Sequence, residues 1–149
     1  GINNIGIGTN NLKSNLSGKR PIGIGINSLK NNKGSVVLFS TVAAKKGFSY
    51  HSIISSAKAG VEGLTVALAA ELAPNIRINC IAPSLTKSKI ASSIIKNTSI
   101  EQSIAKMHPL KRLGEGVDSA NLANFLLTSK SSWITGQIIA VDGGRSTIA

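Results

Sequence analysis

The middle of the chain carries three side chains that can donate a hydrogen bond or a proton: Thr41, His51 and Lys58. The Thr41 hydroxyl could orient a carbonyl oxygen. His51 precedes Lys58 by seven residues, so a helix that includes both would carry them on nearly the same face. Imidazole gains and loses a proton near neutral pH, which makes His51 a candidate proton donor. The alternative stays open, because His51 can also be a partly exposed residue at the start of a helix with no chemical role.

A strand, a loop and a long helix are predicted to position these side chains. Residues 34–41 contain an unbroken apolar run, which is typical of a strand buried on both faces. Apolar residues recur at helical spacing over 52–72, with Ile54 and Leu64 on the predicted buried face, and Pro74 ends the helix. The candidate hydroxyl would then end the strand, and the candidate lysine would lie in the helix.

The remainder of the chain alternates strands with helices. Residues 76–82 and 138–142 are predicted as buried strands, 118–129 as a helix capped by Asp118, and 86–107 as a polar, partly helical flap. Strands that alternate with helices are typical of a parallel sheet covered on both faces. The sequence therefore predicts an α/β fold with a Rossmann-like parallel sheet.

Length and composition indicate one domain. With 149 residues, of which 42% are hydrophobic, the chain can build one modest core. Residues 1–33 are rich in Gly and Asn and hold no acidic residue, so we expect this segment to be weakly ordered and residues 34–149 to form the globular portion.

The strong positive charge has an ordinary explanation. The formal net charge is +11, from 17 Lys plus Arg against 6 Asp plus Glu. The basic residues are scattered and no aromatic residues are interleaved with them, so we expect a solvated surface and no nucleic-acid partner.

The remaining composition argues against a membrane span, a disulfide framework and a metal site. No run reaches the roughly 20 unbroken apolar residues that span a bilayer, so we expect no membrane partner. The single cysteine, Cys80, lies in a strand-like segment and reads as a small buried hydrophobe, which fits a reducing, cytoplasmic location. Two distant histidines and one cysteine lack metal-ligand spacing.

Several stretches together resemble the short-chain dehydrogenase/reductase family. The strand that ends at Thr41, followed by Lys58 in a helix, is similar to its catalytic core. Two further stretches are similar to the strand and loop that meet the nicotinamide and to the carboxyl-terminal signature: Ile76–Thr86, and His108–Gly114 followed by Asp118 and Trp133–Gly144. Near the start, Asn3–Gly6 resembles the family's Asn-Asn-Ala-Gly turn, and Asn15–Gly18 resembles the helix segment that carries its tetrad asparagine.

The resemblance implies an NAD(P)-dependent oxidoreductase that moves hydride to or from a carbonyl, alcohol or activated double bond. It assigns substrate orientation to Thr41, the nicotinamide ribose to Lys58, and a place in the catalytic tetrad to Asn15. Cofactor contacts are implied for Asn4, Gly6, Lys58, Pro83, Ser84, Leu85 and Thr86. A small-molecule substrate, NAD or NADP, and a homo-oligomer follow from the same resemblance.

The chain departs from the family pattern in two respects. Ile54 occupies the position of the tyrosine that donates a proton, four residues before Lys58, and an isoleucine has no proton to give. His51 stands at the spacing of the tyrosine in enoyl-acyl-carrier reductases, relatives with this general layout. The glycine-rich first half of the sheet has no counterpart, so we expect a partial Rossmann-like domain over residues 1–149. A noncatalytic, partner-binding subunit is the alternative function.

Overall fold

The computed structural model describes residues 4–7, 21–24 and 34–148. The described strands are β1 (Asn4–Ile7), β2 (Pro21–Ile24), β3 (Gly34–Phe39), β4 (Ile76–Pro83) and β5 (Ile138–Val141). The α-helices are α1 (Ser52–Leu72), α2 (Thr98–Lys106) and α3 (Gly116–Leu127). Short 3-10 turns lie at Val42–Ala44, Ala91–Ser93 and Ser129–Ser131.

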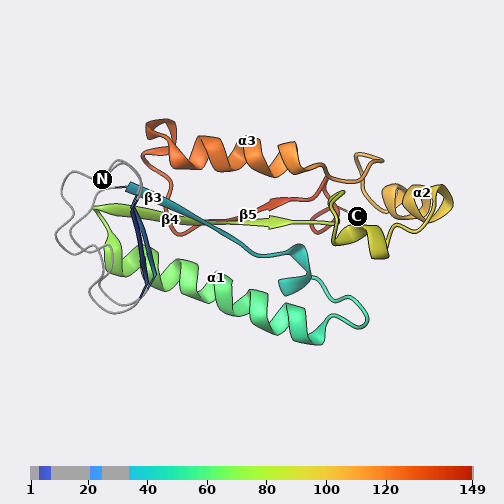
Figure 1. Cartoon of the computed structure of the whole chain (residues 1–149), viewed down its shortest axis with the longest axis horizontal. Coiled ribbons are helices and arrows are strands. Elements are labelled where there is room, and N and C mark those ends of the chain that lie inside the picture. The colour runs from blue at the N-terminus through green and yellow to red at the C-terminus, as the bar shows by residue number, and fades with distance from the viewer. Residues whose placement is uncertain (1–3, 8–20, 25–33, 149) are drawn as a thin grey trace.

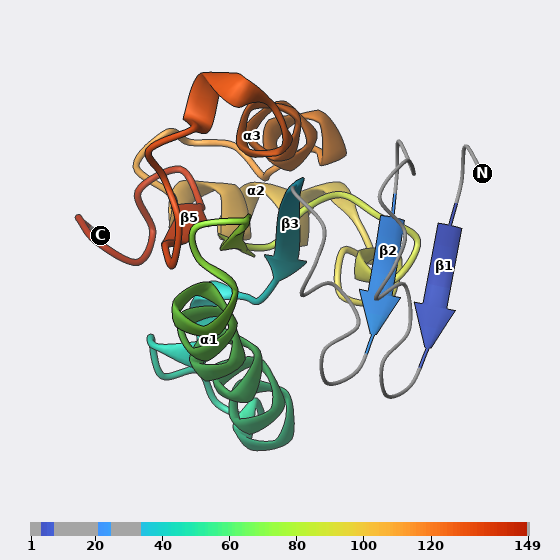
Figure 2. The same cartoon turned by 90° about the vertical axis from the view of Figure 1, so that its left-hand side faces the viewer.

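The main sheet is parallel, in the order β3-β4-β5. Gly34 pairs with Ile76 at one end of β3, and Cys80 pairs with Ile138 where β5 joins β4. Helix α1 lies against one face of this sheet and α3 against the other (Figures 1 and 2). The predicted α/β fold with a parallel sheet and a helix on each face is confirmed.

The core forms where α1 crosses the central strand. Ala69 of α1 packs with Ile76 and Ile78 of β4, and partly buried residues of β3 and α1 surround them: Val36, Leu38, Leu68 and Leu72. On the other face, Leu126 of α3 is fully buried. These aliphatic contacts keep β4, with both faces covered, as the rigid centre of the molecule.

The buried face of α1 differs from the predicted one. Ile54 and Leu64 are 44% and 49% exposed, whereas Glu62 and Thr65 are buried. Both buried polar groups have partners, because Ser40 Oγ donates to Glu62 at 2.8 Å and Thr65 Oγ1 donates to the Val61 carbonyl. Satisfied polar groups can be buried at little cost, so the apolar periodicity alone misplaced the face.

Helix α3 also begins differently from the prediction. Glu115 is its N-cap, and Asp118 is the third helical residue of a capping box rather than the cap. The Asp118 carboxylate accepts the Glu115 backbone N–H at 2.7 Å and pairs with both terminal nitrogens of Arg112. The helix start is therefore fixed by a reciprocal pair of side chains.

Helix α1 is, among the described residues, the one helix long and apolar enough to cross a membrane by length and composition. The helix contains no unbroken apolar run of about 20 residues, because Lys58 and Glu62 interrupt it, but its mean hydropathy still reaches the range of membrane-spanning helices. Its Ala69 side packs on β4, as in core helices of sheet proteins. The absence of a membrane partner stays a prediction.

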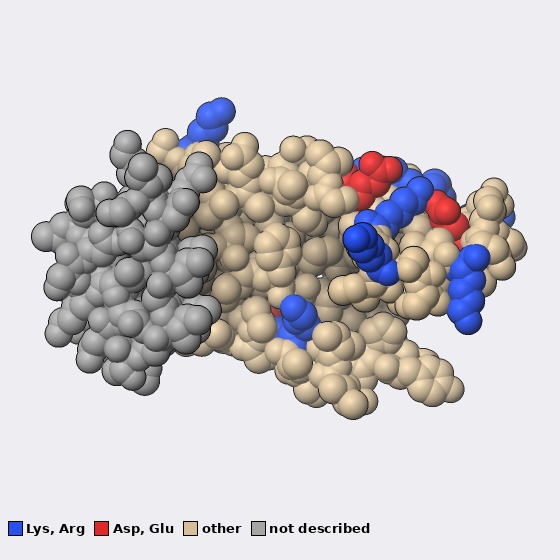
Figure 3. All heavy atoms as spheres, in the orientation of Figure 1, with Lys and Arg blue, Asp and Glu red and all other residues tan. Residues whose placement is uncertain are grey.

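Charged side chains do not form a continuous basic band on the face seen in Figure 3. Lys and Arg stand at separate places, and where several gather, acidic residues lie among them. Ion pairs join Lys87 to Glu101 at 2.7 Å and Arg112 to Asp118 at 2.7 Å. This arrangement favours a solvated surface, and the absence of a nucleic-acid partner stays a prediction.

Candidate functional site

A cleft of about 820 Å³ opens at the carboxyl ends of β3 and β4, and we call it the main cleft. In open parallel sheets ligands bind outside these strand ends. The wall from β3 and α1 comprises residues 39–43, Phe48, His51, Ile54 and Lys58. The opposite wall comprises residues 83–86, Ser88, Ile90, Ala91, Ile94, Ile104, Met107 and Arg145. The structure thus brings Thr41, His51, Lys58 and the 83–86 loop into one cavity.

Thr41 stands where the chain leaves β3. Its Oγ1 accepts the Ala43 backbone N–H at 3.3 Å, which caps the short turn that follows. The same hydroxyl donates to the Pro83 carbonyl at 3.3 Å, at the end of the neighbouring strand β4. The Thr41 hydroxyl is therefore held at the junction of β3 with the loop after β4, where a carbonyl substrate could replace Pro83 as its acceptor.

Lys58 projects from α1 toward the end of β3. Its Nζ donates to the Phe39 carbonyl at 2.9 Å, and its own carbonyl accepts from Ser40 Oγ at 3.3 Å. Neither contact neutralises the ammonium, and no ion pair among residues 34–148 includes Lys58. Lys58 thus offers a positioned cation with two further N–H donors to a ligand in the cleft.

His51 lies at the N-cap of α1 and lines the main cleft. Its Nδ1 is 2.7 Å from the Ser49 carbonyl, and its ring meets Phe48 with 5.5 Å between centroids. Because a carbonyl only accepts, Nδ1 carries a hydrogen in this contact and Nε2 is left for a ligand. Tyr50 is fully exposed, has a positive φ of 63° and does not line the cleft.

Ile54 lies one helical turn before Lys58 and also lines the cleft. An aliphatic group therefore stands where a side chain four residues before the lysine reaches the cavity. That Ile54 takes the place of a proton-donating tyrosine stays a prediction.

The loop after β4 is pinned by close backbone contacts. The Gly114 N–H donates to the Leu85 carbonyl, and Thr86 forms an isolated bridge with Gly114. A Cβ added to Gly114 would lie 2.9 Å from Thr86 Oγ1, so this approach requires glycine. Thr86 Oγ1 in turn donates to the Ser84 carbonyl at 3.0 Å.

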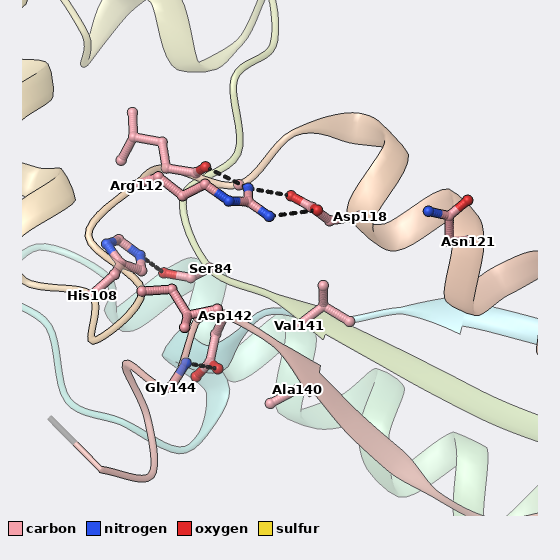
Figure 4. Close-up of a pocket in the computed structure, with 13 residues that line it drawn as sticks. Ser84, His108, Arg112, Asp118, Asn121, Ala140, Val141, Asp142 and Gly144 are labelled. Carbon is pink, nitrogen blue, oxygen red and sulfur yellow. Dashed lines mark hydrogen bonds and ion pairs between the residues drawn. The ribbon is translucent and has the colours of Figure 1, made fainter.

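The hydroxyl of Ser84 bonds to a buried histidine. Its Oγ is 2.9 Å from Nε2 of His108, which is 1% exposed (Figure 4). Nδ1 of His108 is 2.9 Å from the Ile104 carbonyl and must donate to it, so Nε2 accepts from Ser84. The Ser84 hydroxyl is thus satisfied by a buried acceptor.

Ser84 and His108 belong to a second cavity of about 430 Å³, which we call the C-terminal pocket. Figure 4 shows Arg112 and Asp118 on one side and Asp142 with Gly144 on the other. Burial raises the pKa of Asp142, but hydrogen bonds from Ser146 and Gly144 outweigh it and hold that pKa below its ordinary value. Polar groups of this pocket bond in separate pairs: Ser84 with His108, Arg112 with Asp118, and Asp142 with Gly144.

The remaining predicted site residues lie apart from this cavity. Asn4 and Gly6 were expected in a turn, but they lie in β1, where Gly6 pairs with Gly23 of β2. The repeated Ile-Gly pattern of the two segments allows this parallel pairing, which corrects the turn. Asn15 lies outside the described residues.

Two further expectations concern the single cysteine and a metal site. Cys80 is buried, and burial raises the pKa of its thiol, so it behaves as the small hydrophobe expected of it. Within residues 34–148 and the two short strands, no group of three or more His, Cys, Asp or Glu side chains could hold a metal ion.

Comparison with known proteins identifies the family. A family model described as "Enoyl-(Acyl carrier protein) reductase" matches residues 24–146. The chain belongs to the short-chain dehydrogenase/reductase family. Human "Dehydrogenase/reductase SDR family member 4" is 40% identical over 115 residues, which are 74% of this chain and 40% of that protein.

Solved structures show the same relationship. A short-chain type dehydrogenase/reductase from Mycobacterium ulcerans superposes with a TM-score of 0.74 at 32% identity, covering 80% of this chain and 46% of that one. ElxO, solved with NADP bound, gives a TM-score of 0.69 at 34% identity over 75% of this chain and 46% of its own. The chain spans less than half the length of these relatives.

Arg145 is the cleft residue that sequence reasoning missed. It follows the glycine pair 143–144, just after the last strand. Both glycines have positive φ, 60° and 86°, and the turn returns the chain toward the cleft. The signal was the sharp turn after the last strand, but its direction depends on contacts with distant residues.

Proposed function

We propose that this chain forms the nicotinamide- and substrate-binding part of an NAD(P)-dependent oxidoreductase that moves hydride to or from a carbonyl, alcohol or activated double bond. The observation that carries the proposal is the convergence of Thr41, Lys58 and the 83–86 loop on the main cleft. Family membership and the NADP-bound relative ElxO support it.

The residues present fit the nicotinamide end of the cofactor. The Lys58 ammonium has donors for ribose hydroxyls, and the backbone of Pro83–Thr86 borders the same cavity. The Ser84 hydroxyl bonds to His108 and so leaves this backbone accessible. The bound nicotinamide supplies or accepts the hydride. We place this activity in a cytoplasmic homo-oligomer.

Thr41 and His51 would act on the substrate. The Thr41 hydroxyl orients a carbonyl, because it lines the cleft and already donates to one carbonyl, that of Pro83. His51 replaces the proton donor that Ile54 cannot supply. Its Nε2 holds a hydrogen only in the imidazolium form, since the Ser49 carbonyl keeps the other hydrogen on Nδ1.

A turnover assay tests this function. The 149-residue chain should oxidise NADPH or NADH in the presence of members of a panel of ketones, aldehydes and enones. His51→Ala should lower that rate roughly 10²-fold, the lower end of general acid catalysis. Tyr50→Ala, at a fully exposed neighbour outside the cleft, is the control and should leave the rate unchanged. Undiminished turnover by His51→Ala would remove His51 from the mechanism.

A noncatalytic, partner-binding subunit is the second candidate. It is favoured by large apolar residues that are exposed on α1, including Ile53, Leu64 and Val66. Exposed apolar surface of this kind marks an interaction site. Light scattering separates the candidates: a cooperatively folded monomer would count against a required partner.

A further inference from the structure

Arg145 enters the main cleft from the turn that ends the last strand. The Asp142 carboxylate accepts the backbone N–H groups of Gly144 and Ser146 at 2.9 and 2.7 Å, which fixes the turn. Lys46 Nζ donates to the Arg145 carbonyl at 2.6 Å and ties this segment to the loop before α1. The backbone that carries Arg145 is therefore held from both sides.

The Arg145 guanidinium lies among weak partners. Its Cζ stands 4.8 Å from the centre of the Phe48 ring, and its nitrogens reach Ser84 Oγ at 3.4 Å and Met107 Sδ at 3.6 Å. Burial lowers its pKa from the ordinary value, while the nearby Asp142 charge opposes that shift. A guanidinium nevertheless stays charged at neutral pH. None of its close contacts supplies a strong anionic acceptor.

No carboxylate balances this charge inside the cleft. Three ion pairs occur among residues 34–148, and Arg145 belongs to none of them. The cleft lining contains no Asp or Glu, although it contains the cations of Arg145 and Lys58. The Asp142 carboxylate is occupied by Gly144 and Ser146. An anion in the cleft would therefore meet positive charge without competition.

Most of the remaining side chains of the opposite wall are apolar, although Ser84, Thr86 and Ser88 add hydroxyl groups. Leu85, Ile90, Ile94 and Ile104 line it, and Ile54 faces the cavity from α1. An apolar surface of this size favours a hydrocarbon group, since burial removes that group from water. The combination selects a ligand with an apolar body and one anionic end.

We infer that Arg145 is a specificity-determining residue of the main cleft, which takes small apolar substrates that carry a carboxylate, and that the guanidinium binds this carboxylate. The inference rests on the proposed function, because it names the substrate class of the same cavity. A planar guanidinium suits a carboxylate because it can donate two parallel hydrogen bonds.

A charge series without cofactor tests the inference. Hexanoate, 1-hexanol and hexylammonium have the same hydrocarbon chain and differ in the charge of the head group. Calorimetric titration of the 149-residue chain should give hexanoate about tenfold tighter than 1-hexanol, as expected for a charge-assisted hydrogen bond, and hexylammonium weakest. Equal affinity for the three compounds, or no binding of hexanoate, would overturn the inference, and this comparison needs no variant.

Variants then test whether Arg145 causes the preference for hexanoate over 1-hexanol. Arg145→Met should bind hexanoate no better than 1-hexanol and keep its 1-hexanol affinity. Lys130→Met, which removes an exposed cation remote from the cleft lining, should keep the full preference. If Lys58→Met removes the preference and Arg145→Met does not, the carboxylate belongs to Lys58 and the inference is wrong.

Arg145 could also bind a phosphate group of the cofactor instead of a substrate carboxylate. Measuring NADPH affinity for the same variants distinguishes these two roles. NADPH affinity should be the same for Arg145→Met and the wild type. A loss of NADPH affinity with hexanoate binding intact would assign Arg145 to the cofactor and overturn the inference. Hexanoate binding without any NADPH binding would instead contradict the proposed function and leave the carboxylate site standing.

Discussion

The main cleft and the C-terminal pocket share Ser84, yet they treat charge in opposite ways. In the C-terminal pocket, Arg112 pairs with Asp118. In the main cleft, Arg145 and Lys58 face an apolar cavity whose lining has no acidic residue. In the C-terminal pocket, polar bonds therefore hold the loop after β4 and the turn after β5 in place. In the main cleft, the charges of Arg145 and Lys58 have no acidic partner in the lining and are available to a ligand.

The largest effect should come from restoring a phenol to the cleft. Ile54→Tyr would place a hydroxyl one turn before Lys58, where general acid catalysis typically contributes 10²- to 10⁴-fold. We expect the NADPH oxidation rate with a reactive ketone to rise by roughly that factor. Ile53→Tyr is the control, because Ile53 is 87% exposed and outside the cleft lining. Equal rates for the two variants would show that position 54 does not take the place of the tyrosine.

Removing His108 should cost stability rather than binding. His108→Ala leaves the Ser84 hydroxyl and the Ile104 carbonyl without their buried partner, which costs about 1–3 kcal/mol in free energy of unfolding. Urea denaturation measures it. His51→Ala, on the cleft side, should stay within about 0.5 kcal/mol of the wild type. A similar loss of unfolding free energy in both variants would contradict the structural role given to His108.

The turn that carries Arg145 should be sensitive to a single methyl group. Gly144 has a φ of 86°, and an added Cβ would lie 2.9 Å from Ile148 and 3.0 Å from Pro109. Gly144→Ala should lower the free energy of unfolding by about 1–2 kcal/mol, as expected for a left-handed backbone with a Cβ. Gly116→Ala adds a Cβ with nothing within 4 Å and should be neutral within about 0.5 kcal/mol. Equal changes in unfolding free energy for the two variants would show that the turn can shift to accept a Cβ at position 144.

The smallest effect concerns the ion pair of the C-terminal pocket. Hydrogen bonds from Arg112 and from the Glu115 N–H lower the pKa of Asp118 to about 2. Because the folded pKa is depressed, the contribution of Asp118 is complete above its unfolded value and is lost as pH falls through about 2. NMR titration of the Asp118 carboxyl should show that midpoint in the wild type and a higher one in Arg112→Met. An unchanged midpoint would contradict the pairing.

Much of the fold was predictable because local patterns encode it. The helix predicted over 52–72 is α1 with the same bounds, since its apolar spacing and Pro74 are local signals. The strand predicted over 76–82 ends one residue later, at Pro83. The buried face of α1 was wrong because the partner of Glu62, Ser40, comes from another element.

The site was predictable only in part. Thr41, Lys58 and the 83–86 loop flank strand ends, and parallel strands bring such ends to one edge. Arg145 and the apolar wall with Ile104 and Met107 reach the cleft through long-range packing, which no spacing in the sequence specifies. The roles of Thr41, His51 and Lys58 stay predictions.

The central claim is that the main cleft binds the nicotinamide cofactor through Lys58. Calorimetric titration of NADPH and NADH into the 149-residue chain, with its folding checked by circular dichroism, tests it most directly. We predict saturable binding of at least one of them, about tenfold weaker for Lys58→Met, as for loss of a charged hydrogen bond, and unchanged for Lys130→Met. A folded chain that binds neither nucleotide, or binds equally well without Lys58, would contradict the claim.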